Sequence, residues 1–329
     1  MIDNVTARVL DTIKKADLGM TNSLVSPVGT PNYFASVIDA QSNGYLVHCT
    51  DGVGSKVEHL IKHELHNTIG KDCFAMNYND ALCVNANPLS FQNHITSTQE
   101  EAHIIPGVIE GITDYCRDSF TALTGGETEI LQETSFHVSG SIVGTTNKPI
   151  DGSNVNAGDI IIGLKSSGVH SNGWTVIRKR IPGLITKENL TPTKIYNKEI
   201  EKLSSTLDPS AIINVTGGGY RNLERIPNNL KYDLIIKPND IFKELERKLT
   251  HQQLYTTFNC GYGMLVIVRP EMVDIALGCM EDSKIIGSIS TNNRPQVLIN
   301  GEDIYLGKTK PYVYEEKETV ELGFSLTDN

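Results

Sequence analysis

The segment Thr50–Lys56, with the sequence TDGVGSK, constrains the fold of this chain more than any other stretch. It follows an apolar run, Tyr45–Cys49, that is typical of a short buried strand, and it precedes Val57–Lys62, which is typical of a helix start. An acid, two glycines, a hydroxyl and a lysine therefore stand where a strand passes into a helix. Glycines there let backbone N–H groups approach an anion closely.

The chemistry that this junction favours is binding of phosphate and magnesium. Asp51 stands at the strand end, where its oxygens are the hard donors that Mg²⁺ prefers, and Lys56 supplies a positive charge for phosphate oxygens. The P-loop pattern G-x-x-x-x-G-K-[ST] does not occur in the chain, so a phosphate site has to be of another kind. A plain turn with a solvated lysine is the alternative.

Composition excludes several classes of protein. The 329 residues carry a formal net charge of −10, which argues against a general nucleic-acid binder and against binding to an anionic membrane surface, although not against nucleotides. The six cysteines form no C-x-x-C pair, so we expect reduced thiols in a cytoplasmic protein rather than a zinc ribbon or a redox motif. The start of the chain lacks the pattern of a signal peptide, and no apolar run approaches the length of a membrane helix.

Strand and helix patterns alternate in both halves of the chain. This predicts an α/β or α+β fold with a ligand in the crevice beyond the strand ends. Residues 147–159 are rich in Asn, Gly, Pro and Asp, as expected of a connection between domains. We therefore predict one domain over residues 1–158 and a second over residues 159–329.

Two further polar segments in the first half are candidates for the same site. A helix expected from residue 69 carries Asp72, Asn79 and Asp80 close to one face, where they could meet water or a cation. A short strand expected over residues 120–124 runs into Gly125–Thr128, a second strand end with glycines and an acid.

In the second half, two loops join a strand to a helix. Residues 166–173 connect an expected strand to a helix that begins at Trp174, and helix N-termini of this kind bind anions. A lone histidine such as His170 is, however, more often structural. Residues 216–219 place three adjacent glycines after another strand, which requires at least a tight loop.

Three histidines, His59, His63 and His66, could share one face of a helix and suggest a metal site. Leu60 stands where the H-E-x-x-H motif has its general base, so a solvated helix face is favoured.

Taken together, the loops resemble those of one family, phosphoribosylformylglycinamidine cyclo-ligase, also called aminoimidazole ribonucleotide synthetase. The segments that carry the resemblance stand in the family's order between about residues 45 and 290: residues 50–56, Asn79–Asp80, 125–128, 167–173, 190–196, 216–219 and 257–264.

The resemblance implies a two-domain fold of the aminoimidazole-ribonucleotide-synthetase type. Its N-terminal sheet would pair across a homodimer, and a larger C-terminal α/β domain would pack against it. The implied reaction is ATP-dependent ring closure of formylglycinamidine ribonucleotide in purine biosynthesis, with ATP and Mg²⁺ required and no nucleic acid or membrane partner.

The resemblance also implies roles for single residues, and matched positions give three groups. Catalytic roles fall to Asp51, Lys56 and His170. Metal binding falls to Asp51, Asp80 and Glu127. Nucleotide binding falls to Gly52, Gly54, Ser55, Asn79, Gly125, Gly126, Thr128, Ser171, Asn172, Gly217, Gly218 and Gly219.

The first half departs from the family pattern at three places. Residues 32–35 read NYFA in place of a G-G-F-G segment, Asn93 stands where an acid is usual, and residues 129–132 lack the family's continuation. These departures leave two alternatives to the cyclo-ligase: a non-catalytic nucleotide-binding paralogue, and another ATP-using member of the same superfamily.

Overall fold

The computed structural model describes residues 26–28, 33–40, 44–238 and 240–304. All of them belong to one compact unit, Ser23–Tyr305. Asn32, at the first departure from the family pattern, lies outside the described residues. No helix in these ranges is both long and apolar enough to cross a membrane.

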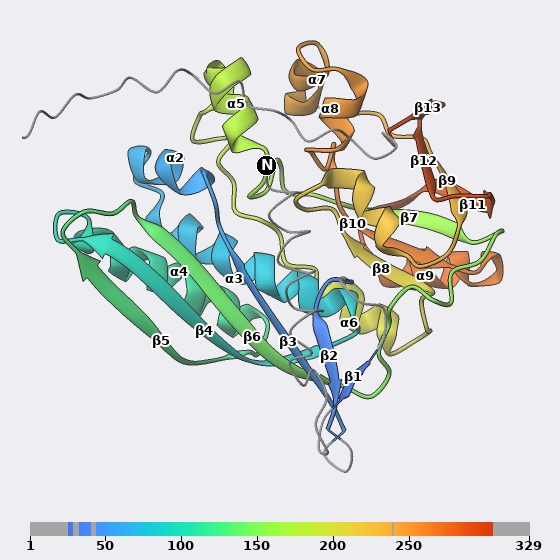
Figure 1. Cartoon of the computed structure of the whole chain (residues 1–329), viewed down its shortest axis with the longest axis horizontal. Helices are drawn as coiled ribbons and strands as arrows, with labels where there is room; N and C mark the ends of the chain where they lie inside the picture. The colour runs from blue at the N-terminus through green and yellow to red at the C-terminus, as the bar shows by residue number, and fades with distance from the viewer. Residues whose placement is uncertain (1–25, 29–32, 41–43, 239, 305–329) are drawn as a thin grey trace, which may run out of the picture. The chain divides into compact units, whose positions relative to one another are not determined.

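The first half builds a six-stranded sheet (Figure 1). All neighbouring strands are antiparallel except β4 and β5, which run parallel. The strands, in spatial order, are β1 (Ser26–Val28), β2 (Ser36–Asp39), β3 (Tyr45–Gly52), β6 (His137–Thr146), β4 (Asn87–Thr98) and β5 (Ala122–Leu131).

Two helices, α3 (His66–Cys83) and α4 (Ile105–Asp118), lie on one side of this sheet (Figure 1). The strands alternate accordingly: Phe91 on β4 is fully buried and its ring lies 5.1 Å from that of Phe74 on α3, whereas Gln92 is exposed. The short helix α2 (Lys56–Lys62) precedes α3, and a single 3-10 turn, Ala102–Ile104, precedes α4.

The second half builds a seven-stranded sheet. Neighbouring strands in this sheet are antiparallel, except that β9 and β12 run parallel to each other. The strands, in spatial order, are β13 (Glu302–Asp303), β12 (Gln296–Ile299), β9 (Leu230–Leu234), β11 (Ser283–Thr291), β7 (Ile160–Lys165), β10 (Tyr262–Val268) and β8 (Ala211–Asn214). The helices are α5 (Trp174–Arg180), α6 (Asn197–Ser204), α7 (Asp240–Glu246), α8 (His251–Tyr255) and α9 (Val273–Cys279), with 3-10 helices at Pro182–Leu184, Gly219–Arg225 and Pro270–Met272.

The observed fold is therefore mixed α+β with two sheets, and the expected domain boundary at residues 158 and 159 falls between them. That these halves are separate domains stays a prediction.

One expected strand end is wrong. Gly125–Thr128 does not form a loop, because β5 continues through these residues to Leu131. Parallel pairing with β4 supplies the backbone partners, and a register shift opposite Phe91 and Gln92 accommodates the extra residue Thr124.

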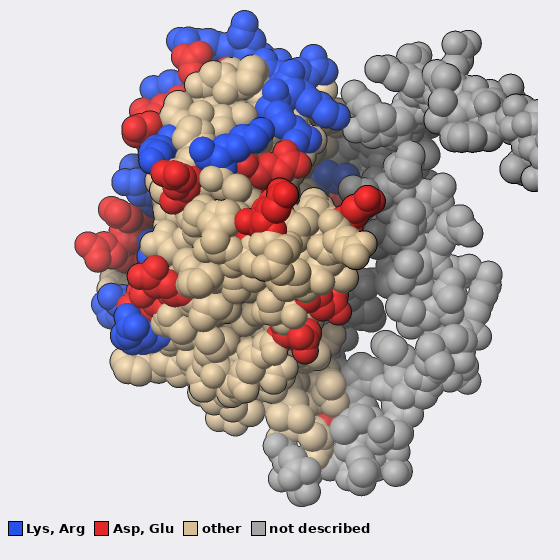
Figure 2. Space-filling model, turned by 90° about the vertical axis from the view of Figure 1, so that its left-hand side faces the viewer, with Lys and Arg blue, Asp and Glu red and all other residues tan. Residues whose placement is uncertain are grey.

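Surface charge is uneven despite the net negative balance. Figure 2 shows Lys and Arg side chains gathered at the top of the molecule, the level at which α5 and α7 lie in Figure 1. The last turn of α5 contributes Arg178, Lys179 and Arg180, all exposed.

Candidate active site

The strand-to-helix junction forms as the sequence predicts, with β3 ending at Gly52 and α2 beginning at Lys56. Gly54 has a φ of 73°, in the left-handed region where glycine carries no Cβ penalty. The Ser55 hydroxyl lies 2.8 Å from that of Thr175 on α5, so the turn is fastened to the second half of the chain.

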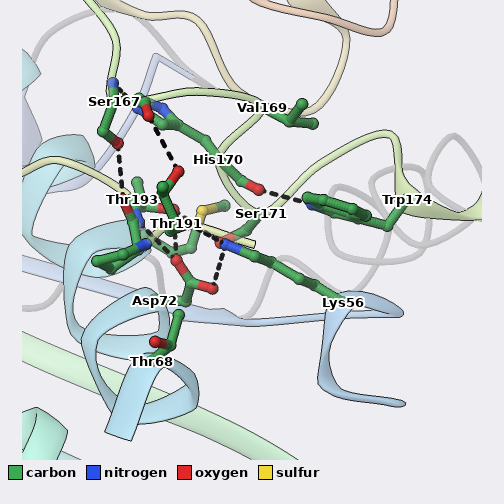
Figure 3. Close-up of polar contacts among 12 residues, drawn as sticks. Lys56, Thr68, Asp72, Ser167, Val169, His170, Ser171, Trp174, Thr191 and Thr193 are labelled. Atoms are coloured by element: carbon green, nitrogen blue, oxygen red, sulfur yellow. Dashed lines mark hydrogen bonds and ion pairs between the residues drawn. The ribbon is translucent and has the colours of Figure 1, made fainter. Parts of the chain in front are cut away.

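Lys56 is fully buried and is enclosed by groups of the protein (Figure 3). Its Nζ lies 2.7 Å from Asp72 Oδ2, donates to the Thr191 carbonyl at 2.6 Å, and lies 5.7 Å from the centre of the Trp174 ring. Burial lowers the pKa of Lys56, and the charge of Asp72 opposes that shift. In this arrangement the lysine braces α2 against α3 and the second half.

Asp72 links three segments. Its Oδ1 accepts hydrogen bonds from the backbone N–H and the hydroxyl of Thr193, both at 2.7 Å, while Oδ2 meets Lys56. The Thr193 hydroxyl lies 3.0 Å from that of Ser171, so the chain of polar contacts reaches the histidine loop (Figure 3).

His170 is buried at the turn of that loop with a φ of 64°. Burial, helped by the charges of Lys56 and Lys194, lowers the pKa of His170 to about 3. The ring is therefore neutral at physiological pH, and its Nε2 accepts a hydrogen bond from the Ser167 N–H at 3.3 Å. The His170 carbonyl accepts from Trp174 Nε1 at 2.7 Å, which joins the loop to the start of α5.

Asp51 and Asp80 form an acid pair between β3 and α3. Burial raises the pKa of Asp80 to about 7; the charge of Asp51 adds to that rise, and a hydrogen bond from Asn214 Nδ2 at 2.8 Å opposes it. Burial also raises the pKa of Asp51. The Gly52 N–H, which donates to Asp51 Oδ1 at 2.7 Å, opposes this rise. Arg225 lowers both pKa values through its charge.

Such a pair fits a magnesium–nucleotide complex, because Mg²⁺ is commonly held by one or two carboxylates together with substrate phosphates. Two acids held against their own repulsion and desolvation gain most from a nearby cation.

Within a single copy of the chain, Glu127 lies away from Asp51 and Asp80. Gly52 pairs with Ser139, Ser139 with His94, and His94 with Glu127, so three strand spacings of about 4.8 Å, or about 14 Å in total, separate the backbone of Gly52, next to Asp51, from that of Glu127.

The two acids also face opposite sides of the sheet. Cys49 Sγ contacts the Asn77 carbonyl on α3, which puts Cys49 and therefore Asp51, two residues on, on the helix side. Glu127 is exposed and stands opposite His94, whose neighbours Asn93 and Ile95 are buried on that helix side. In the part of the chain that the structure describes, no group of three or more His, Cys, Asp or Glu side chains could hold a metal ion.

The histidine hypothesis for residues 59–66 is wrong in its geometry. Helix α2 ends at Lys62 and α3 begins at His66, so the three side chains share no helical face. His59 is instead buried with its ring 6.1 Å from that of Trp174.

Asn79 holds the two halves together, and Asn172 joins two loops of the second half. Asn79 Nδ2 donates to the Lys194 carbonyl at 2.9 Å, and its Oδ1 accepts from the Tyr196 N–H at 3.3 Å. Asn172 Nδ2 donates to the Thr216 hydroxyl at 2.6 Å, which ties the histidine loop to the glycine loop.

The glycine loop follows β8 and is fixed by close packing. Gly218 and Gly219 have φ values of 98° and 58°, and a Cβ on Gly219 would lie 2.3 Å from the Tyr255 carbonyl oxygen. Gly125, Gly126 and Thr128, by contrast, lie in β5 and are exposed.

Sequence reasoning missed Asn214 and Arg225, both of which act on the acid pair. Asn214 could have been noticed as a polar residue at the end of an apolar strand, next to the glycine loop. Arg225 gave no such signal.

Comparisons with known proteins agree with this geometry. The description "AIR synthase related protein, N-terminal domain" matches residues 34–146, and "AIR synthase related protein, C-terminal domain" matches residues 156–300. The two sheets and the loops between them thus define an AIR synthase-related protein.

Curated relatives narrow the class of protein, and a solved structure shares the fold. A phosphoribosylformylglycinamidine cyclo-ligase of Bifidobacterium animalis subsp. lactis is 34% identical over 304 residues, covering 81% of this chain and 87% of that protein. One of Alkaliphilus oremlandii is 33% identical over 312 residues, covering 84% and 91%. The hydrogenase maturation protein HypE, solved in complex with ATP, shares the fold with a TM-score of 0.59 at 15% identity, over 81% of this chain and 86% of that one. The chain belongs to the phosphoribosylformylglycinamidine cyclo-ligase family.

Proposed function

We propose that this protein catalyses ATP-dependent closure of formylglycinamidine ribonucleotide to aminoimidazole ribonucleotide. Membership of the cyclo-ligase family, at 34% identity over most of the chain, carries this proposal. The fold likeness to HypE, a protein solved with ATP, supports a nucleotide as the second ligand.

In this reaction ATP phosphorylates the formyl oxygen, the neighbouring nitrogen attacks the same carbon, and phosphate leaves as the imidazole ring closes. Positioning and charge neutralisation account for most catalysis of phosphoryl transfer. A site with acids and glycine loops but no strong nucleophile suits that demand.

We assign magnesium binding to Asp51 and Asp80, which would hold the ion against the nucleotide phosphates, where it would neutralise charge. Glu127 is not assigned to this set, because it is exposed on the face of the sheet opposite to Asp51. Lys56 and His170 act by positioning, because the lysine is enclosed by Asp72 and Thr191 and the neutral imidazole accepts from Ser167.

The nucleotide phosphates are assigned to the junction around Gly52, Gly54 and Ser55 and to the loops that carry Ser171, Asn172 and Gly217–Gly219. The bonds of Asn79 to Lys194 and Tyr196 fasten α3 to the second half of the chain.

The test is ADP release that depends on formylglycinamidine ribonucleotide, measured with purified protein and magnesium. We expect turnover with wild-type protein and its loss in Asp80→Asn, with unchanged circular dichroism. Absence of turnover in folded wild-type protein refutes the proposal.

A non-catalytic nucleotide-binding paralogue is the second candidate, and the contacts of Tyr33 and Phe34 favour it. Tyr33 is buried and donates from its hydroxyl to the Ile212 carbonyl at 2.9 Å, and the Phe34 ring lies 4.6 Å from the Arg225 guanidinium. Tyr33 and Phe34 are therefore anchored rather than open for a ligand. Calorimetric binding of Mg·ADP without turnover on formylglycinamidine ribonucleotide would identify this case.

We also propose a homodimer that uses the open face of the first sheet. Leu46 and Val143 are 37% and 43% exposed on that face, next to polar side chains such as Gln92. Light scattering should give twice the mass of the chain, and a monomer would contradict this. Six free thiols, five of them buried, support a cytoplasmic location.

A further inference from the structure

Asn214 joins the acid pair of the first half to the glycine loop of the second. Its Nδ2 donates to Asp80 Oδ1 at 2.8 Å across 134 residues of sequence. The residue is 3% exposed and ends β8, immediately before the loop that begins at Thr216.

The position of Asn214 is itself fixed from two sides. Its backbone pairs with Met264 on β10, and the next residue, Val215, donates to the Gly263 carbonyl at 3.0 Å. The Asn222 amide donates to the Asn214 carbonyl at 3.0 Å and to the Thr216 carbonyl at 3.4 Å. The amide that meets Asp80 is thus part of the same rigid frame as the start of the glycine loop.

From this geometry we infer that Asn214 is a positioning residue that orients the Asp80 carboxylate toward a cation and sets its distance from the phosphate-binding glycine loop. The inference rests on the proposed function, because it needs a cation at Asp80.

The chemistry of the contact supports this role. An amide donor occupies one oxygen of the carboxylate and fixes the rotation of its plane, which leaves Oδ2 as the oxygen that can ligate. Asn214 carries no charge, so it orients Asp80 without competing with a cation, which an arginine or lysine in that place would do.

The competing explanation is that Asn214 only fastens the two halves together. In that case its loss would lower stability but leave the metal affinity of the folded protein unchanged. Loss of a group that supports a metal ligand costs about 10- to 100-fold in metal affinity, so the two explanations differ measurably.

The experiment measures Mn²⁺ binding to the full chain in the presence of ADP, by the decrease in the electron paramagnetic resonance signal of free Mn²⁺. We expect Asn214→Leu to raise the Mn²⁺ dissociation constant at least tenfold. Asn228→Ala is the matched control: that amide also bridges segments, donating to the Val155 carbonyl at 2.8 Å, and its loss should leave Mn²⁺ affinity unchanged. Equal Mn²⁺ affinity in Asn214→Leu and wild type overturns the inference.

A second variant keeps the test decisive if Asn214→Leu does not fold. Asn214→Ala removes the same amide donor without adding bulk beside Asp80, so its Mn²⁺ dissociation constant with ADP should also rise at least tenfold. Mn²⁺ affinity equal to that of the wild type overturns the inference. Failure of wild-type protein to bind Mn²⁺ with ADP would instead refute the proposed function, and the inference with it.

Discussion

The buried ion pair between Lys56 and Asp72 allows a quantitative test of how this site is built. Nζ and Oδ2 lie 2.7 Å apart, and both side chains are 0% exposed. At that separation the attraction is about 6 kcal/mol for an effective dielectric constant of about 20. Removing each ion from water costs several kcal/mol, so the net contribution of the pair is small, whereas an ion left without its partner is costly.

We therefore expect Asp72→Asn to lower the free energy of unfolding by about 3–5 kcal/mol, because Lys56 stays buried without its counter-ion. Lys56→Met should cost less, since Asp72 keeps both hydrogen bonds from Thr193. The double variant should lie within about 2 kcal/mol of the wild type, so the coupling energy should be at least about 1 kcal/mol plus the cost of Lys56→Met.

Urea denaturation followed by tryptophan fluorescence measures this directly. Trp174 is the single tryptophan, is fully buried, and has its ring 5.7 Å from Lys56 Nζ. The exposed pair Arg178–Glu58, with side chains 41% and 54% exposed, is the control, and its coupling should stay below about 1 kcal/mol. A coupling below about 1 kcal/mol for Lys56 and Asp72 would refute the argument.

Three further outcomes follow from the same contacts. His170 has its pKa lowered to about 3, against about 6.5 when unfolded, so the unfolded state binds more protons between these values and stability falls as the pH drops below 6.5. From pH 7 to pH 5 the wild type should lose about 2 kcal/mol more unfolding free energy than His170→Gln; equal losses would mean that His170 is not held neutral. Gly219→Ala should lower stability by at least about 2 kcal/mol in a denaturant titration, because its Cβ would meet the Tyr255 carbonyl at 2.3 Å, whereas Gly217→Ala, whose nearest neighbour would be Asn172 Oδ1 at 3.5 Å, should be nearly neutral. A Gly219→Ala protein as stable as Gly217→Ala would show that the loop is not fixed as described. Asp51→Asn should weaken Mg·ADP binding at least tenfold by calorimetry with unchanged circular dichroism; unchanged affinity would remove Asp51 from the metal hypothesis.

Local patterns predicted the segments whose structure is decided locally. The apolar run before Asp51 is a strand, and the residues after Ser55 form a helix. Both could be predicted because the spacing of apolar residues and the positions of glycines are signals that extend over only a few residues. The same holds for β7, the histidine loop and α5, and for β8 followed by the glycine loop.

Long-range pairing decided what local patterns could not. Two glycines after Leu123 suggest a loop, yet parallel pairing with β4 keeps the chain extended to Leu131. The separation of Glu127 from Asp51 follows from strand order and face, and neither can be obtained from the spacing of residues along one chain. The sequence predicted a Lys56 that meets phosphate oxygens, with a solvated lysine as the alternative. The side chain is instead fully buried, which is rare for lysine, and its partner Asp72 lies on another helix.

The charges around the candidate site favour binding of a cation over binding of a free anion. Lys56 is neutralised by Asp72 at 2.7 Å, Lys194 lies 2.7 Å from Glu199, and His170 is uncharged at physiological pH. Neither lysine is among the charges that lower the pKa of Asp51 or Asp80, and the charge of Arg225 offsets only part of the rise that burial causes. A free polyphosphate would be repelled by two carboxylates, whereas a magnesium–nucleotide complex would relieve their mutual repulsion and their desolvation. Lys56 and Asp72, which brace the two halves, are therefore distinct from Asp51 and Asp80, to which the cation is assigned, and this allows stability and cation binding to be altered separately at these positions.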